Sequence, residues 1–176
     1  IRDKNIPIYD SPGSSQLPRN SVEECFNYIV SMIDESIPNL MDDVTAVNSE
    51  TGRITKIVAK AMKAEILVYA ASPLFNGNVG SEASITNNDG KELFNHSYSS
   101  EKWQLAAKAC KDAIDFATEH GKKLHTWTPT GGFTPQASTQ FQMNIREAYN
   151  ENTDNPEVLW LDTKSTANGT IQGYFM

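Results

Sequence analysis

Apolar residues recur at helical spacing in four stretches of the chain, and each stretch predicts one amphipathic helix. The first stretch carries apolar residues at intervals of three and four: Val22, Phe26, Ile29, Ile33 and Ile37. This spacing places them on one face of a helix. Ser21 and Glu24 have the spacing of a capping box, in which a side chain and a backbone amide satisfy each other. We therefore expect a helix from Val22 to near Pro38.

The second stretch, residues 55–71, has a narrow polar stripe in an otherwise apolar or small sequence. Lys56, Lys60 and Lys63 lie at spacings of four and three, on one face. A helix with one narrow polar stripe is buried between neighbours. Glu65 follows Lys56 by nine residues, about 180° around the helix. We therefore expect Glu65 to point inward and to be paired with a cation or a hydrogen-bond donor.

The third and fourth stretches predict a long helix and a shorter one. The third begins at Ser99 or Ser100 and ends before Gly121, which suits a left-handed cap. Its apolar face carries six residues: Trp103, Ala106, Ala107, Cys110, Ile114 and Ala117. The fourth runs from about Gln140 to Tyr149. Its apolar positions are Phe141, Ile145 and Ala148.

The segments between these helices read as loops. Residues 73–98 are irregular, with turn signals at Asn76-Gly77 and Asp89-Gly90. Residues 126–139 are rich in Thr, Gly, Pro and Ser, and residues 158–161 are a short extended candidate. The chain is therefore expected to be mostly α, with long irregular loops.

The helices are expected to stack in antiparallel pairs, because their alanine-rich faces allow close approach. Ser21 and Thr55 are 34 residues apart, the period of a tetratricopeptide helix pair. Residues 1–20 are rich in Pro, Ser and Asn and predict an extended lead-in. Residues 21–176 predict part of one helical domain.

The net charge of the chain argues against one class of binding partner. A net charge of -7 argues against a nucleic-acid binder, which needs a basic face toward phosphates. No stretch approaches the ~18 consecutive apolar residues that span a bilayer. The first residue is Ile1 rather than Met, and the last residues form an apolar run. Both ends favour a fragment of a longer protein.

The reactive side chains predict no catalytic, cofactor or metal site. His96, His120 and His125 form no zinc-ligand pattern. Residues 87–90 resemble part of a calcium loop, but His96 stands where the loop needs a glutamate. Cys25 and Cys110 are expected to be small buried hydrophobes on helices. No nucleophile elbow or phosphate loop is present.

Aromatic residues outside the helices are the best candidates for ligand contact. A flat ring offers a surface that matches the C–H face of a sugar. Trp127 is the first choice, because it lies in a loop between two threonines with no local pattern that demands burial. The predicted ligand-binding residues are Thr126, Trp127, Thr128, Phe133, Gln136, Tyr174 and Phe175. The alternative is that these aromatic side chains only anchor their loops to the helices. Three other aromatic residues are expected to lie in the core: Phe26, Trp103 and Trp160.

Several motifs in order resemble one known family. Residues 52–77 end in Tyr-Ala-Ala-Ser-Pro-Leu-Phe-Asn-Gly, and residues 88–94 read Asn-Asp-Gly-Lys-Glu-Leu-Phe. Glu-Lys-Trp at 101–103 opens an alanine-rich helix, and residues 155–160 read Asn-Pro-Glu-Val-Leu-Trp. The sequence thus resembles the central part of the SusD-like (RagB/SusD) family over about residues 20–161. The resemblance departs at Glu65, where the family commonly has arginine.

The resemblance implies a fold and a role. The fold is a tetratricopeptide-like α-α superhelix of antiparallel helix pairs that carries a loop-rich binding part. The role is non-catalytic capture of an oligosaccharide at the extracellular face of the outer membrane, for delivery to a SusC-like TonB-dependent transporter. We expect the family's lipid anchor to lie outside this stretch of sequence. Two alternatives are a helical-repeat scaffold that binds only the transporter and, with less support, a glycoside hydrolase, whose two carboxylates must face each other across a cleft.

Overall fold

The computed structural model describes residues 18–44, 50, 52–80, 84–132, 134–150 and 155–160. Over these residues the fold is mostly α, as the sequence predicts. The helices are α1 (Val22–Ser36), the short 3-10 helix η1 (Ile37–Asn39), α3 (Lys56–Ala71), α4 (Ser100–Glu119) and α5 (Ala137–Asn150). Within these described ranges the β pairing is one isolated antiparallel bridge between Thr86 and Glu92. Residues 158–160 form no strand, and Leu161 and the first 17 residues lie outside the described part.

The helix bounds follow the local signals closely. Ser21 caps α1: its hydroxyl accepts the amide of Glu24, whose carboxylate accepts the amide of Ser21. Beyond α4, Gly121 adopts a φ of 81° and the Lys122 amide bonds the Ala117 carbonyl at 2.9 Å. That bond satisfies a carbonyl that the end of the helix leaves free. α5 begins at Ala137, three residues before the expected start.

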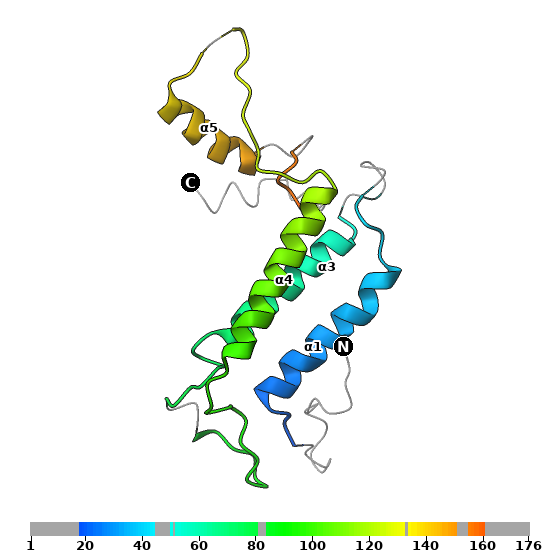
Figure 1. Cartoon of the computed structure of the whole chain (residues 1–176), viewed down its shortest axis with the longest axis vertical. Coiled ribbons are helices and arrows are strands. Elements are labelled where there is room, and N and C mark those ends of the chain that lie inside the picture. The colour runs from blue at the N-terminus through cyan, green and yellow to red at the C-terminus, as the bar shows by residue number, and fades with distance from the viewer. Residues whose placement is uncertain are drawn as a thin grey trace, which may run out of the picture. The chain divides into compact units, whose positions relative to one another are not determined.

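The chain divides into two compact units, residues 1–39 with 59–114 and residues 40–58 with 115–176. In the first unit, α1 and the larger parts of α3 and α4 lie side by side (Figure 1). Lys102 near the start of α4 bridges to Glu23 near the start of α1 at 3.3 Å. Lys63 in α3 bridges to Asp34 near the end of α1 at 2.6 Å. α1 and α4 therefore run parallel to each other, and α3 runs antiparallel to both (Figure 1).

The face of α3 that is buried is the reverse of the predicted one. Residues flanking the lysine stripe are buried, among them Ala59, Ala64 and Ala70. Glu65 is exposed, and its neighbours on that face are also exposed: Met62, Val68 and Tyr69. The prediction of a buried, paired Glu65 is therefore wrong. The lysines lie along the neighbouring helices because their long apolar stems pack while their ammonium groups reach carboxylates.

Small side chains make much of the buried core. In the first unit the buried apolar residues are Ala59, Ala64, Ala70, Ala71, Leu93, Ala106 and Ala109. Alanines on facing helices let the backbones come close, which suits paired helices. In the second unit Ile57 and Val58 are buried beside Thr55, whose hydroxyl accepts the Val58 amide at 3.4 Å.

The face of α4 is also rotated from the expected one. Ala106 and Ala109 are buried, whereas Trp103 is 42% exposed and Ile114 is 65% exposed. The core assignment of Trp103 is therefore wrong, and so is that of Trp160, which is 55% exposed in the second unit. Cys25 is exposed on α1, contrary to expectation, and both cysteines are free thiols.

The long connection between α3 and α4 is held by two buried asparagines. Asn76 bridges the two helices, since its side chain donates to the Ala71 and Ser99 carbonyls and accepts the Ser99 amide at 2.7 Å. Asn87 donates to the Arg19 carbonyl and accepts the Arg19 guanidinium. Residues 87–90 form a turn, closed by an Asn87–Lys91 backbone bond of 2.9 Å. The Asn-Gly and Asn-Asp-Gly motifs therefore have structural roles here.

Candidate functional site

The loop that carries Trp127 lies in the second unit, where α5 fixes its backbone. The Trp127 amide donates to Oδ1 of Asn144 at 2.9 Å, and its carbonyl accepts Nε2 of Gln140 at 2.8 Å. Gln140 also donates to Asn144 at 2.8 Å. These two residues lie one helical turn apart, so they reach the same stretch of loop. The loop at Trp127 is thus held in a defined conformation through its backbone.

The side chains around this anchor differ in exposure. Trp127 is half-buried, while Thr126, Thr128 and Gln136 are exposed. Gln136 leads into α5, where its carbonyl accepts the Gln140 amide at 2.9 Å. The structure therefore places these four predicted residues at or beside one loop and helix start. The other three, Phe133, Tyr174 and Phe175, lie outside the described residues.

α5 uses a polar face to hold the loop and leaves an apolar stripe exposed. Phe141, Ile145 and Tyr149 are 68%, 67% and 87% exposed at spacings of four residues. Phe141 and Ile145 lie on the exposed side because the hydrogen bonds of Gln140 and Asn144 fix which side of α5 meets the loop. The apolar pattern of the sequence does not reveal these two anchoring residues. The signal for them was a pair of amide side chains four positions apart.

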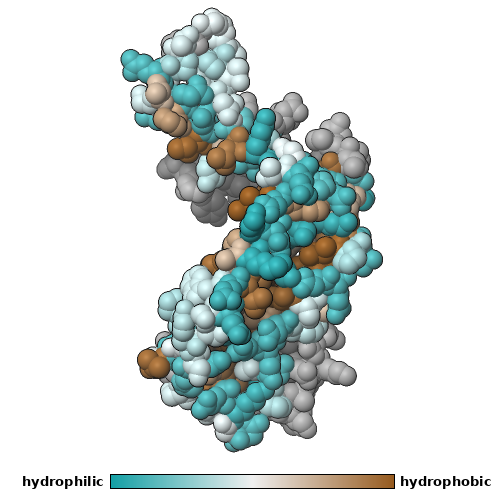
Figure 2. Space-filling model, viewed as in Figure 1, coloured by the Kyte–Doolittle hydropathy of each residue, from teal (hydrophilic) through white to brown (hydrophobic). Residues whose placement is uncertain are grey.

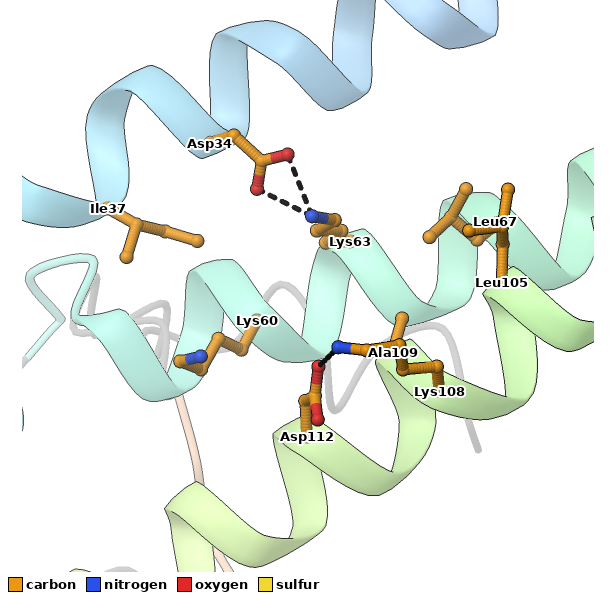
Figure 3. A pocket seen from close by; sticks show the side chains of 9 residues that line it. All are labelled: Asp34, Ile37, Lys60, Lys63, Leu67, Leu105, Lys108, Ala109 and Asp112. Atoms are coloured by element: carbon orange, nitrogen blue, oxygen red, sulfur yellow. Dashed lines mark hydrogen bonds and ion pairs between the residues drawn. The ribbon is translucent and has the colours of Figure 1, made fainter.

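A second candidate site is a groove in the first unit between α1, α3 and α4 (Figure 3). The lining side chains are Asp34 and Ile37 from the first helix and its extension, Lys60, Lys63 and Leu67 from α3, and Leu105, Lys108, Ala109 and Asp112 from α4. The groove has a volume of about 290 Å³. On the face of the molecule drawn in Figure 2, apolar side chains show between polar ones over these helices. The periodicity of single helices gave no sign of this groove, because three separate segments form it.

Charged groups of both signs meet in the groove. Lys63 Nζ lies 2.6 and 2.7 Å from the two Asp34 oxygens, and Lys108 Nζ lies 2.8 Å from Asp112. The Lys108 hydrogen bond, with weaker contributions from Lys60 and Lys63, lowers the pKa of Asp112. The same bond raises the pKa of Lys108. Both shifts favour the charged forms, so ammonium donors and carboxylate acceptors lie side by side near neutral pH.

The described residues show neither a metal centre nor a membrane span. Within these ranges, no three His, Cys, Asp or Glu side chains gather closely enough to hold a metal ion. None of the described helices is both long and apolar enough to cross a bilayer. His120 stacks near Phe116 and its ring contacts that residue's carbonyl at 2.8 Å, which is a local packing arrangement.

Comparisons with known proteins find similar structures. No family model matches the chain, and no curated protein matches it. The chain is similar to BT4246 of Bacteroides thetaiotaomicron, with a TM-score of 0.62 and 29% identity over 82% of this chain and 28% of that one. The selenomethionine form of BT4246 gives a TM-score of 0.59 and 28% identity over 82% and 27%. The chain thus resembles one part of a Bacteroides protein in sequence and in helical fold. The matched part is 28% of that protein's length.

Proposed function

We propose that this chain is the central part of a SusD-like protein that captures oligosaccharide without catalysing a reaction. The observation that carries the proposal is the anchored loop at Trp127. Its backbone is fixed by two hydrogen bonds, one to Asn144 and one from Gln140, and these two side chains are bonded to each other. Its half-buried indole lies between two exposed threonines. A ring presented from a pre-ordered backbone loses little conformational freedom when a ligand stacks on it.

The surroundings of Trp127 suit a sugar. Thr126 and Thr128 carry hydroxyls that donate and accept hydrogen bonds, and Gln136 carries an amide that does both. Sugar sites combine an apolar surface with a few such groups. The similarity to a part of BT4246 and the order of the SusD-like motifs support the family assignment.

The same proposal covers location and partner. A SusD-like protein is held on the outer face of the outer membrane by a lipid anchor and delivers its glycan to a SusC-like TonB-dependent transporter. Support for a protein partner comes from the exposed apolar face of α3, where Tyr69 is 57% exposed beside Met62 and Val68. Soluble proteins rarely leave contiguous apolar patches uncovered unless something binds there.

The test of glycan capture is isothermal titration calorimetry of the chain with a panel of neutral oligosaccharides. We expect a Kd of roughly micromolar or weaker for the best ligand, since water competes for every hydroxyl. Trp127→Ala should weaken that binding at least tenfold. Trp103→Ala, which removes a half-exposed indole from α4, is the matched control and should leave the Kd unchanged.

The alternative is a scaffold that binds only the transporter, and the exposed α3 face favours it. The two functions give different outcomes in the same experiment. If no oligosaccharide binds, while Tyr69→Ser weakens association with a purified transporter, the scaffold function replaces the glycan-binding one. If glycan binds and Trp127→Ala has no effect in a folded protein, the loop residue is only an anchor and the ligand site lies elsewhere.

A further inference from the structure

Trp160 presents a large aromatic side chain to solvent although the protein holds its ring in place. The residue is 55% exposed, and its Nε1 donates to the Gly52 carbonyl, 108 residues away in the chain, at 3.0 Å. That bond satisfies the polar edge of the indole, so the flat apolar ring is the part that a ligand can use. A ring already held in one position loses little conformational freedom when a ligand covers it.

The backbone that carries Trp160 is joined to the Trp127 loop within the second compact unit. Oε2 of Glu157 accepts the His125 amide at 2.8 Å, and the carbonyl of the residue before Glu157 accepts the Lys123 amide at 3.2 Å. His125 lies two residues before Trp127, and Glu157 lies three residues before Trp160. Even fully extended, these stretches of backbone together span at most about 18 Å. One oligosaccharide of several units can therefore reach both indoles.

The turn that accepts the indole of Trp160 also carries charged side chains. The Arg53 amide donates to the Glu50 carbonyl at 3.0 Å, which closes the turn that contains Gly52. The guanidinium of Arg53 is 62% exposed and lies 3.8 Å from the Glu50 carboxylate, too far for a hydrogen bond. Guanidinium donors and carboxylate acceptors both suit sugar hydroxyls. An apolar ring and a few polar groups thus occur together, as ligand sites require.

We propose that the Trp160 indole is a second stacking site, for another neutral sugar ring of the oligosaccharide that binds at Trp127. The C–H face of the sugar covers the indole, and hydroxyls at its edge bond to Arg53 and Glu50. Because these two side chains balance each other's charge, the site does not select an anionic sugar. The inference rests on the proposed function and deepens it, since it predicts a ligand of several sugar units rather than one.

The experiment is isothermal titration calorimetry of the chain with cello-, malto- and manno-oligosaccharides, each from disaccharide to hexasaccharide. In the series that binds best, we expect the Kd of the hexasaccharide to be about tenfold lower, because its second contact is made within one ligand. Trp160→Ala should remove this gain and bring the two Kd values together. Trp103→Ala, which removes a 42% exposed indole from α4, should preserve the gain.

Trp160→Phe separates stacking from support of the turn. It keeps a flat ring but loses the donor to Gly52, so the hexasaccharide should retain most of its gain. A loss equal to that in Trp160→Ala would show that the hydrogen bond matters and the ring does not, which overturns the inference. Should either variant fail to fold, NMR of the unmutated chain decides: the hexasaccharide must shift the ring C–H signals of Trp160, and unshifted signals overturn the second site.

Failure of the second site is distinguishable from failure of the proposed function. Hexasaccharide binding that is weakened in Trp127→Ala but unchanged in Trp160→Ala overturns the second site and leaves glycan capture at the loop intact. A Kd that does not fall with the length of the oligosaccharide has the same meaning. If none of the three series binds, both the second site and glycan capture are overturned.

Discussion

At the scale of single residues, hydrogen bonds decide the behaviour of several charged groups. Glu24 accepts the Lys91 ammonium at 2.6 Å and the Ser21 amide at 2.7 Å through the same carboxylate oxygen. The Lys91 bond is the larger cause of a pKa lowered from 4.5 to about 2. Lys91 lies in the loop before α4, so this one carboxylate joins the cap of α1 to a distant segment.

The lowered pKa of Glu24 gives a pH-dependent prediction. Because the folded pKa lies below the unfolded one, the stabilisation is complete above about pH 4.5 and is lost as pH falls toward about 2. NMR titration of the Glu24 carboxyl should give a pKa of about 2. Lys91→Ala should raise that pKa toward 4.5, whereas Lys108→Ala should leave it unchanged. An unshifted pKa in Lys91→Ala would show that the ion pair is absent in solution.

Glu65 gives a second prediction, which follows from its exposure. A surface carboxylate can be truncated with little effect on the free energy of unfolding, usually within about 0.5 kcal/mol. Glu65→Ala should therefore leave the melting temperature nearly unchanged. Asn76→Ala, which removes a side chain only 4% exposed and its three hydrogen bonds, provides the destabilised comparison. A loss of several degrees in Glu65→Ala would contradict the exposed placement.

At the scale of elements, the link between α3 and α4 depends on close backbone approach. Gly77 has a φ of 82°, and a Cβ there would meet backbone and Cβ atoms of Tyr98 at 3.0 Å. Gly90 has a similar φ of 84°, but a Cβ at that position would meet nothing within 4 Å. Left-handed backbone costs an L-residue roughly 1–2 kcal/mol in either place.

The two glycines form a matched pair for mutation. Gly90→Ala should lower the free energy of unfolding by about 1 kcal/mol, from backbone strain alone. Gly77→Ala should lower it by at least about twice as much, because the methyl group also crowds the Tyr98 backbone. Urea denaturation of both variants measures the difference. Equal losses would mean that the connection moves easily and that Gly77 is needed only for its φ.

α5 provides the element-scale prediction for the binding loop. Asn144→Ala removes the acceptor of the Trp127 amide, so that amide should open more readily. Loss of one partly buried hydrogen bond corresponds to about 1 kcal/mol, or roughly fivefold faster amide exchange. Gln142→Ala, an exposed substitution on the same helix, is the control. Equal exchange rates for Trp127 in both variants would show that the loop is held by other contacts.

At the scale of the whole molecule, the chain should behave as a mainly helical protein. Far-ultraviolet circular dichroism should show the two helical minima with no dominant β signal. The reason is that α1, α3, α4 and α5 each run for 14 to 20 residues in the described ranges. A spectrum dominated by strand would contradict this fold.

The sequence predicted the helices well because their signals are local. Capping at Ser21, the stop after Ala71 and the glycine at 121 each act within one or two turns of the chain. The mostly helical class and the turns of the long connection follow from such signals. The loop position of Thr126, Trp127 and Thr128 also followed from the sequence, since their segment has no helical period.

Only the tertiary structure decided which face of each helix is covered. The lysine stripe of α3 lies inward and Glu65 outward, while α5 turns Gln140 and Asn144 to the loop and Phe141 to solvent. Periodicity fixes the angle between two faces of a helix, but neighbours choose which face is buried. The groove that holds Lys63 and Leu105 likewise needs three segments to meet, and no single segment encodes that meeting.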